Sequence, residues 1–432
     1  MTVHEEGRAK GPARREGTRA RSRAGSRSRR TRAAVVIVVT VLAGSAALAG
    51  CAPSGMLVDG RPRSAAEAIR IVPDDGARGV GARERLEVRV PDGRLQRVEV
   101  RRAGDVAGRA GDVGRQPLAG RISPDGLTWR PTSGRLALGS KYTVDVVALD
   151  GEGRRSARHT TFTTFVPPHR FIGFYTPESN TRVGTGMIVS LTFNRRIADR
   201  AAVERGIRVT ARPAVEIGAH WFGSRRLDFR PRTRWKPGTV ITVDLRLRDV
   251  KAGPDAYGTQ RKTIRYRVGR DQISTIDAAR HTMTVRRSGR VLARLPVTAG
   301  NAANPTYNGK MVILARQSVT RMDGDTVGFG GEYDIKDVPH AMRLTRSGTF
   351  LHGNYWAPPA IFGGLNTSHG CVGLKDIRGG GPDTPAGWLF AHSIVGDTVE
   401  VRNSQDRTVA PDNGLGGWNM SWARWRAGSA LR

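Results

Sequence analysis

The residues best suited to nucleophilic chemistry lie together in the C-terminal third of this sequence, as Ser368-His369-Gly370-Cys371. Cys371 is one of only two cysteines in 432 residues, and His352-Gly353 begins nineteen residues before it. The other cysteine, Cys51, is assigned below to a lipid, so Cys371 has no disulfide partner within the chain. A free thiol close to histidine is what nucleophilic catalysis needs. The thiolate attacks a carbonyl, and an imidazole can take up the thiol proton and later return it to a leaving amine. We therefore predict a cysteine-dependent acyl-transfer site.

The two histidines are expected to have different roles. His369 precedes Cys371 by two residues, so in an extended segment the two side chains lie in parallel on one face and need not touch. His352 belongs to a separate strand and can approach the sulfur head-on, so we assign it as the base and His369 as a residue that organises the site. Gly370 leaves the backbone bare beside the nucleophile. The N–H groups of Gly370 and Cys371 could then face an oxyanion, a role that contributes about 3–4 kcal/mol in acyl-transfer sites.

Two other roles are compatible with these histidines and the cysteine. His352, His369 and Cys371 could ligate zinc, because nitrogen and sulfur ligands suit that metal. The sequence has no CxxC or HExxH motif, and no carboxylate general base lies close by, so we predict neither a metal nor a cofactor. The other alternative is a solitary buried cysteine with two incidental histidines.

The N-terminal segment has the pattern of an export signal. Arg-rich residues 8–32 precede an uncharged run at 33–49, AAVVIVVTVLAGSAALA, which is typical of the apolar region of a signal peptide. A signal-anchor helix is the alternative, because about 17 residues is the lower limit for spanning a membrane. Leu48-Ala49-Gly50-Cys51 favours the signal peptide, since it resembles the bacterial lipobox, whose cysteine accepts diacylglycerol. We therefore predict that Cys51 is lipidated and anchors the protein to the outer leaflet of the membrane, outside the cytoplasm.

The chain is strongly basic, with 71 Lys and Arg against 38 Asp and Glu and a formal net charge of +33. Such an excess raises nucleic acid as a partner. Beyond the N-terminal segment the surplus is spread thinly, with no Arg-rich recognition helix and no ladder of basic and aromatic residues, so we predict no nucleic-acid binding. Arginine on solvated faces and attraction to a polyanionic wall or membrane surface are compatible explanations of the charge.

Residues 69–270 predict antiparallel β-sandwiches. Short alternating runs are separated by Gly, Pro and Asp, and no long amphipathic helix interrupts them. The predicted strands are Leu86–Val90, Val98–Arg102, Tyr142–Ala148, Thr160–Thr164, Met187–Phe193, Val240–Leu247 and Thr263–Val268.

An internal repeat divides this region into two similar units. Leu127–Pro131, LTWRP, recurs 100 residues later as Leu227–Pro231, LDFRP, and in each copy a glycine turn and an alternating strand follow. The spacing predicts two immunoglobulin-like domains in which Trp129, Trp221 and Phe229 are core residues. Their expected role is to hold the last domain away from the membrane.

The region after Gln272 is expected to be a mostly β domain with one short helix. Glycine, asparagine and aspartate mark loops at 300–309 and at 322–331, and the second of these is expected to be mobile. Pro at the start and Gly396 beyond the end mark the helix Pro385–Ile394. The predicted strands are Gln272–Ile276, Thr282–Arg287, Val291–Ala299, Met311–Arg316, Arg343–Thr345, Thr349–His352 and Thr398–Val401.

The motif formed by His352-Gly353 and Ser368–Cys371 resembles the signature of the L,D-transpeptidases of the YkuD family. Gly396–Val401 and Gly414–Asn419, with the tryptophans of the tail, are similar to the ending of the mycobacterial-type members. Those enzymes are anchored outside the membrane behind immunoglobulin-like domains, so the resemblance covers nearly the whole mature chain. It implies a mostly β protein with two immunoglobulin-like sandwiches before a YkuD-type catalytic domain.

The resulting expected organisation is a lipoprotein signal peptide, a tether, two immunoglobulin-like domains, a catalytic domain, and a Trp-rich C-terminal tail that packs on the catalytic domain. These parts are expected at residues 1–50, 51–66, 67–166, 167–269, 270–403 and 404–432.

The resemblance also implies an activity on peptidoglycan stem peptides. The cysteine of the family attacks the bond between diaminopimelate and the terminal D-alanine of a tetrapeptide stem. The acyl-enzyme then passes to the side-chain amine of another diaminopimelate, which links the third residues of two stems. Resolution of the acyl-enzyme by water, as an L,D-carboxypeptidase, or by another amine is an alternative, and a non-catalytic wall-binding lipoprotein is a second. The acceptor, the timing and the oligomeric state are left open by the sequence.

Site roles follow from the same resemblance. Cys371 is implied as the nucleophile and His352 as its base, oriented by the backbone carbonyl of Gly353, and carbapenems are expected to acylate the thiol. The substrate-binding set is expected to include Tyr333 near donor or oxyanion, Met322 in a lid, Ser347-Gly348 in a strand along the substrate, Ser368 and Gly373. One position departs from the family, because Gly373 stands where an asparagine is usual, two residues after the cysteine. This departure is expected to bear on substrate preference more than on reaction class.

Overall fold

The computed structural model describes residues 65–105, 117–133, 135–327 and 330–431. The predicted signal peptide, the lipid acceptor Cys51 and most of the tether lie outside the described residues. Within the described ranges, no helix is both long enough and apolar enough to cross a membrane.

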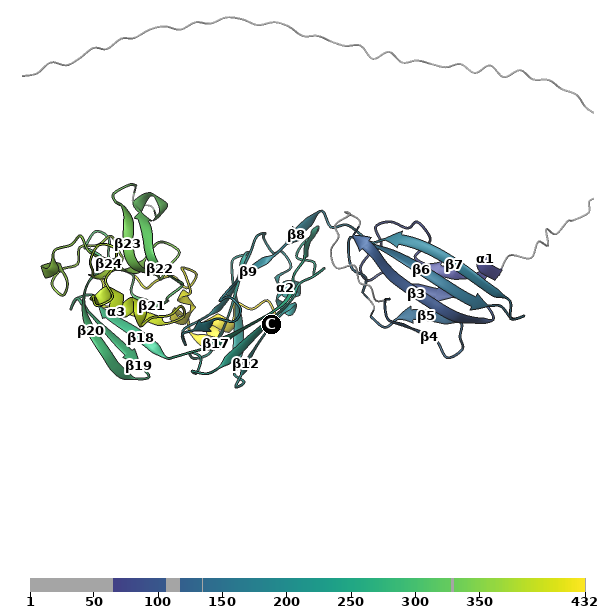
Figure 1. Ribbon diagram of the computed structural model, residues 1–432, viewed down its shortest axis with the longest axis horizontal. Coiled ribbons are helices and arrows are strands. Elements are labelled where there is room, and N and C mark those ends of the chain that lie inside the picture. Colours follow the sequence, from purple (N-terminus) through teal and green to yellow (C-terminus); the bar gives the residue numbers. More distant parts are fainter. Residues whose placement is uncertain (1–64, 106–116, 134, 328–329, 432) are drawn as a thin grey trace, which may run out of the picture. The chain divides into compact units, whose positions relative to one another are not determined.

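The first domain is a sandwich of two antiparallel sheets around one core (Figure 1). Its sheets have the strand orders β1-β2-β5-β4 and β3-β6-β7, and apolar side chains from both sheets form one cluster. In β6 the buried side chains alternate with more exposed ones, as expected of a strand with one face on a core. The elements are α1 (Ala65–Ala68), β1 (Arg70–Val72), β2 (Glu87–Arg89), β3 (Arg94–Asp105), β4 (Gly120–Ile122), β5 (Thr128–Pro131), β6 (Ser140–Leu149) and β7 (Arg155–Thr163).

The second domain repeats this architecture with the sheets β10-β17-β15-β12 and β13-β14-β11-β9, and a short two-stranded sheet joins β8 to β16. Its elements are β8 (His169–Phe171), β9 (Gly173–Thr176), β10 (Arg182–Val183), β11 (Val189–Phe193), α2 (Arg200–Arg205), β12 (Ile207–Arg212), β13 (Ile217–Phe222), β14 (Arg226–Pro231), β15 (Val240–Arg246), β16 (Ala256–Gly258) and β17 (Arg261–Val268).

The sequence repeat corresponds to equivalent strands of the two sandwiches. LTWRP and LDFRP lie on β5 and β14, each inside a four-stranded sheet, and the alternating strands that follow are β6 and β15, each inside the opposite sheet. Trp129, Trp221 and Phe229 are buried, as predicted. The seven strands predicted in this region all coincide with observed strands, because alternation against one core is a local signal.

The third domain is built on a nine-stranded mixed sheet with the order β21-β26-β18-β19-β20-β25-β24-β23-β22. The helix α3 (Pro385–Ala391) begins at the predicted proline, and its N-cap Thr384 accepts a hydrogen bond from the N–H of Gly387 at 3.0 Å. The other elements are β18 (Gln272–Asp277), β19 (Thr282–Arg287), β20 (Arg290–Thr298), β21 (Gly309–Val312), β22 (Ala315–Asp323), η1 (Gly324–Val327), β23 (Asp334–Arg343), β24 (Phe350–Asn354), η2 (Pro359–Ile361), β25 (Val372–Lys375) and β26 (Thr398–Arg402). The mostly β fold class is therefore confirmed.

The hairpin β22–β23 was missed by the sequence analysis, and Figure 1 shows it extending from the rest of its domain. The predicted strand Met311–Arg316 is divided, because Ile313 donates its N–H to Asp397 whereas Leu314 donates to Arg343, so the chain changes neighbours there. The predicted loop at 322–331 starts inside β22, since Met322 pairs with Ile335. Few residues of β22 are buried, which removes the alternation that would have marked the strand.

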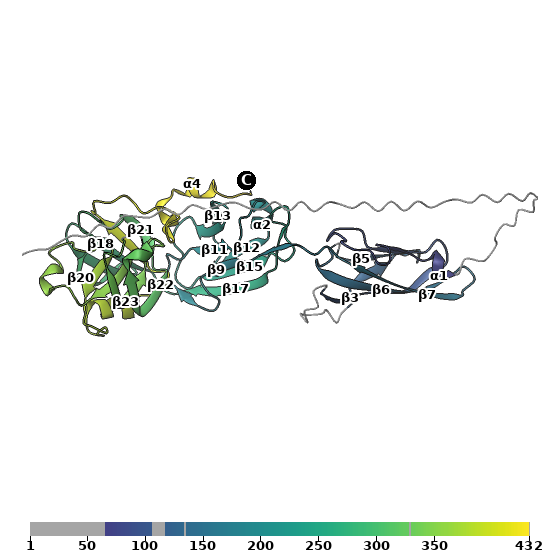
Figure 2. The same ribbon diagram turned by 90° about the horizontal axis from the view of Figure 1, so that it is seen from above.

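The C-terminal tail does not pack on the catalytic domain alone, and this prediction is corrected. Lys310 of β21 exchanges backbone hydrogen bonds with the side chain of Asn419, but the tryptophans lie on the second sandwich. Figure 2 shows helix α4 (Trp422–Arg426) beside β13, and the indole N–H of Trp425 donates to the carbonyl of Gly218 at 2.9 Å. The guanidinium of Arg230 lies 4.5 Å from the ring of Trp425, and burial lowers the pKa of Arg230 to about 10. A second short helix of the tail is η3 (Gly416–Asn419).

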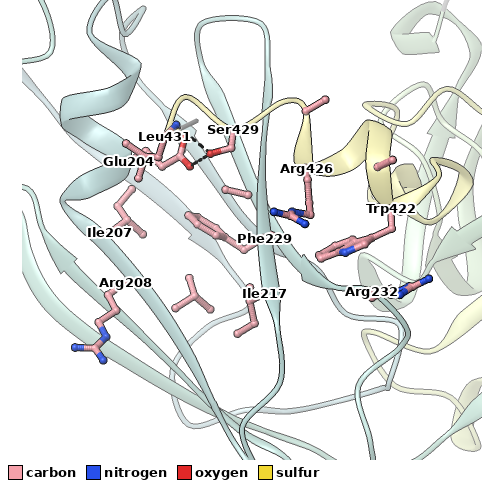
Figure 3. A pocket seen from close by; sticks show the side chains of 15 residues that line it. Glu204, Ile207, Arg208, Ile217, Phe229, Arg232, Trp422, Arg426, Ser429 and Leu431 are labelled. Atoms are coloured by element: carbon pink, nitrogen blue, oxygen red, sulfur yellow. Dashed lines mark hydrogen bonds between the residues drawn. The ribbon is translucent and has the colours of Figure 1, made fainter.

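A buried carboxylate holds the end of the tail (Figure 3). Glu204 of α2 accepts hydrogen bonds from the hydroxyl of Ser429 at 2.5 Å and from the N–H of Ala430 at 2.9 Å. The indole N–H of Trp221, inside the sandwich, donates to the same carboxylate at 2.8 Å. Since charge-assisted hydrogen bonds are among the stronger ones, the tail is fastened to the core of the second domain at both α4 and its final residues.

Candidate active site

Two neighbouring parallel strands, β24 and β25, position the reactive residues. Their register places His352 directly beside Gly373, two residues after Cys371. Side chains at i and i+2 of an extended segment share a face of the sheet. The sequence therefore brings the thiol of Cys371 and the imidazole of His352 to the same side, although nineteen residues separate them in the chain.

That face borders a pocket of about 410 Å³, within the size range of small-ligand sites. Six residues predicted for the site line it together: Met322, Tyr333, His352, Ser368, His369 and Cys371. Other lining residues come from β23, from the end of β24 and from the segment that follows it, and they include Ile335, Asn354, Trp356 and Ile361.

The Cys371 thiol is held in a desolvated position. Burial raises its pKa to about 11, an effect partly offset by a hydrogen bond from the backbone N–H of Phe350. Its Sγ donates to the carbonyl oxygen of Gly348 at 3.4 Å. A thiol with such a pKa is protonated at neutral pH, so a base must remove its proton as the sulfur attacks.

His352 has the protonation state of such a base. Its Nδ1 lies 2.9 Å from the carbonyl oxygen of Gly353. Because a carbonyl only accepts, Nδ1 must carry the proton, which leaves Nε2 with a free lone pair. Burial lowers the pKa of His352 below its usual value, although the Gly353 carbonyl and the nearby carboxylate of Asp376 oppose this effect. The imidazole is therefore neutral at pH 7, and its ring stacks on Trp356 at 5.6 Å.

Position 353 has room only for glycine, because the buried carboxylate of Asp376 lies against it. A Cβ at this position would lie 2.1 Å from Oδ2 of Asp376. That oxygen also lies 2.7 Å from Nδ1 of His340, while Oδ1 accepts hydrogen bonds from Gly381 and Thr384. Asp376 thus packs against the residue whose carbonyl orients His352.

Tyr333, from the connection between β22 and β23, lies against His369 on one side of the pocket. Their ring centroids are 5.2 Å apart, and Nε2 of His369 lies 3.0 Å from a carboxylate oxygen of Glu332. Burial, and next the charge of an ionised Cys371, raise the pKa of Tyr333 to about 12, so its hydroxyl remains a hydrogen-bond donor at neutral pH. Met322 lies in β22 of the hairpin, in a small apolar cluster against which Tyr333 packs. The organising, substrate and lid roles of these three residues stay predictions.

The turn before the nucleophile is fastened by Ser368. Its hydroxyl donates to the carbonyl of Cys371 at 2.5 Å and accepts from the N–H of Gly370 at 3.2 Å. The predicted use of the Gly370 N–H for an oxyanion is therefore corrected, because that group is already bonded within the turn. Gly370 adopts a φ of 104°, which favours glycine.

Ser347 and Gly348 lie in a turn between β23 and β24, not in the predicted strand. Gly348 has a φ of 98°, and Ser347 is tied to the tail by a 2.8 Å hydrogen bond from the amide of Asn413. Both residues line a second pocket of about 320 Å³, together with His369, Gly370 and Arg407. His369 lines both pockets, whereas Cys371 lines only the first.

Sequence reasoning missed four residues that shape the site: Ile335, Asn354, Trp356 and Asp376. A signal existed for Asn354 and Trp356, since these residues follow His352 at intervals of two. Ile335 and Asp376 reach the site only through strand pairing and loop folding. Within the described parts of the chain, no group of three or more His, Cys, Asp or Glu side chains is arranged to hold a metal ion.

Comparison with known proteins assigns both regions of the chain. Residues 77–251 match the family model of a bacterial Ig domain, and residues 271–401 match that of the L,D-transpeptidase catalytic domain. The chain is 34% identical to L,D-transpeptidase 2 of Mycobacterium tuberculosis (strain CDC 1551 / Oshkosh) over 359 residues, which are 82% of this chain and 83% of that protein. It is 29% identical to L,D-transpeptidase 5 of M. tuberculosis (strain ATCC 25618 / H37Rv), over 83% of this chain and 76% of that protein.

A solved L,D-transpeptidase in complex with imipenem is 29% identical to this chain, with a TM-score of 0.45 over 55% of this chain and 100% of that one. The 34% identity to L,D-transpeptidase 2 covers about four-fifths of this chain. With an Ig-like region before a matching catalytic domain, this chain belongs to the L,D-transpeptidase family.

Proposed function

We propose that this protein crosslinks peptidoglycan stem peptides as a cysteine L,D-transpeptidase, through a thioester on Cys371. The observation that carries the proposal is a shared pocket that contains the thiol and a neutral imidazole with a free nitrogen. Membership of the family supports the reaction class. The bond formed would join the diaminopimelate residues at the third positions of two stems.

The first half-reaction forms the acyl-enzyme. The Cys371 thiol gives its proton to Nε2 of His352 while the sulfur attacks the carbonyl carbon between diaminopimelate and the terminal D-alanine of a tetrapeptide stem. Collapse of the tetrahedral intermediate breaks the carbon–nitrogen bond, the imidazolium protonates the leaving amine of D-alanine, and a thioester remains. The hydroxyl of Tyr333 and the N–H of Cys371 are the candidate donors to the oxyanion.

The second half-reaction transfers the acyl group. The side-chain amine of another diaminopimelate attacks the thioester and loses a proton to His352, which then protonates the departing sulfur. The second pocket, which shares His369 with the first and is lined by the adjacent Gly370, is the candidate binding place for an amine acceptor. Attack of the thiol on the β-lactam carbonyl of a carbapenem would stop at the acyl-enzyme.

The product of the reaction tests this proposal. Purified full-length protein, incubated with tetrapeptide muropeptides, is expected to release D-alanine and to form a dimer linked between third residues, both detected by mass spectrometry. Tripeptide without dimer would instead indicate an L,D-carboxypeptidase. If neither product forms and imipenem leaves no adduct on Cys371, the protein is a non-catalytic wall-binding lipoprotein and the proposal fails.

We further propose that the enzyme works outside the cytoplasm as a lipoprotein. The lipobox-like sequence at Leu48–Cys51 supports this, as does a family role on wall peptides. Cys51→Ala is expected to leave the specific activity unchanged but to move the protein from the membrane to the soluble fraction, because two acyl chains are needed for stable anchoring. Cell fractionation with immunoblotting measures this, and a variant that stays with the membrane would contradict lipidation at Cys51.

A further inference from the structure

The space above Gly373 is occupied by another residue of the pocket. A Cβ at Gly373 would lie 3.3 Å from both Cβ and Nδ2 of Asn354, and 3.0 Å from a methyl group of Thr298. Gly373 stands beside His352 in the strand pairing, and Asn354 follows His352 by two residues on the same face. Because Gly373, two residues after the nucleophile, has no side chain, there is room there for the amide of Asn354 from the neighbouring strand β24.

The amide of Asn354 is oriented and buried. Its Oδ1 accepts the N–H of Ala357 at 3.0 Å, which fixes the direction of Nδ2. Asn354 is 6% exposed, and it lines the pocket together with His352 and Cys371. Nδ2 makes no hydrogen bond to another described residue and is not sealed from solvent, so it is accessible from the pocket. An amide N–H that is oriented and accessible from a pocket can donate to an acceptor atom of a ligand bound there.

We propose that Asn354 binds the donor stem peptide, with its Nδ2 donating to a carbonyl or carboxylate oxygen of that peptide beside Cys371. This inference rests on the function proposed above and identifies how the donor is held. Gly373 is then the complement of Asn354, because the pocket has space for one amide and the neighbouring strand supplies it. A stem peptide bound by Asn354, on the same strand as His352, would have its acyl carbon held within reach of the Cys371 sulfur.

Asn354→Asp is the matched variant that separates binding from structure. Aspartate keeps the shape and the Oδ1 that accepts from Ala357, but it replaces the donating nitrogen with an accepting oxygen. We expect kcat/KM for the tetrapeptide donor to fall about tenfold or more, because one donated hydrogen bond is lost and an acceptor faces an acceptor. A purely structural role of Oδ1 would leave kcat/KM unchanged, because aspartate retains that oxygen. Asn354→Ala removes the donor without adding a charge and should lower kcat/KM as well.

A double variant tests whether Gly373 and Asn354 are complementary. Gly373→Asn alone should lower kcat/KM because its side chain overlaps Asn354 and Thr298. Combined with Asn354→Ala, it should recover most of the wild-type value, since the amide then reaches the pocket from the position after the nucleophile. If the losses of kcat/KM simply add, and the double variant is no more active than Asn354→Ala, then positions 373 and 354 are not alternative places for one amide.

Donor binding without turnover distinguishes this inference from the proposed reaction. In the full-length Cys371→Ala background, calorimetric titration with the tetrapeptide stem should give a Kd about tenfold weaker when Asn354→Asp is added. Equal affinities in the two proteins would rule out Asn354 as a donor-binding residue even if the wild type crosslinks normally. Weaker binding by the Asn354 variant, combined with no product from the wild type, would support the binding role and refute the transpeptidase.

Discussion

Cys371→Ala is expected to reduce D-alanine release and dimer formation to the uncatalysed background, a loss of at least about 10³–10⁴-fold. No thioester can form without the sulfur, and no other thiol lies in the pocket that holds His352. The change should not unfold the protein, because the hydrogen bonds of the Sγ, to the carbonyl of Gly348 at 3.4 Å and from the N–H of Phe350, are weak sulfur contacts. Mass spectrometry of muropeptide products, and of intact protein after imipenem, measures both losses.

His352 supplies the control for that result. If the thiol and the imidazole act as one unit, His352→Ala added to Cys371→Ala should cause no further loss, while His352→Ala alone should remove about 10²–10⁴ of the rate. Residual activity above a few per cent in Cys371→Ala would mean that another nucleophile carries the acyl group. Such an outcome would contradict the mechanism even with an intact fold.

Trp425→Ala is expected to have the largest effect on stability, lowering the free energy of unfolding by about 3–5 kcal/mol. The indole is fully buried, it stacks on His220 at 5.0 Å, and its N–H donates to Gly218. Truncation leaves a cavity and an unsatisfied carbonyl, and it exposes the guanidinium of Arg230 to an emptied site. Urea unfolding followed by fluorescence and circular dichroism measures the change.

Trp356→Ala is the matched control for the stability prediction. Its indole is 42% exposed and lies at the pocket, so the same truncation should cost about 1 kcal/mol or less. The core cluster that contains Trp425 also includes Val312 of the catalytic domain. Loss of Trp425 is therefore expected to unfold the second sandwich and the catalytic domain in one transition at lower urea. Equal midpoints for Trp425→Ala and the wild type would show that the tail does not stabilise the fold.

Much of the architecture could be predicted because its signals are local. The strands of the two sandwiches alternate apolar and polar residues against one core, and helix α3 begins at a proline after a threonine cap. The hairpin β22–β23 had no such signal, since most of β22 is exposed on both faces. A strand without a buried face has no periodic pattern to detect.

The residue types and spacing of the sequence by themselves determined the family, through the histidine and cysteine motif, and predicted a chemistry that uses the Cys371 thiol and a histidine base. Only the tertiary structure decided how those groups are supported. It placed Trp425 on the second sandwich, Asp376 behind Gly353, and the amide of Asn354 over Gly373. The physical reason is that chemistry follows from the identity of a side chain, which is local. A side chain's neighbours depend on strand register and loop folding, which bring together residues that no sequence interval relates.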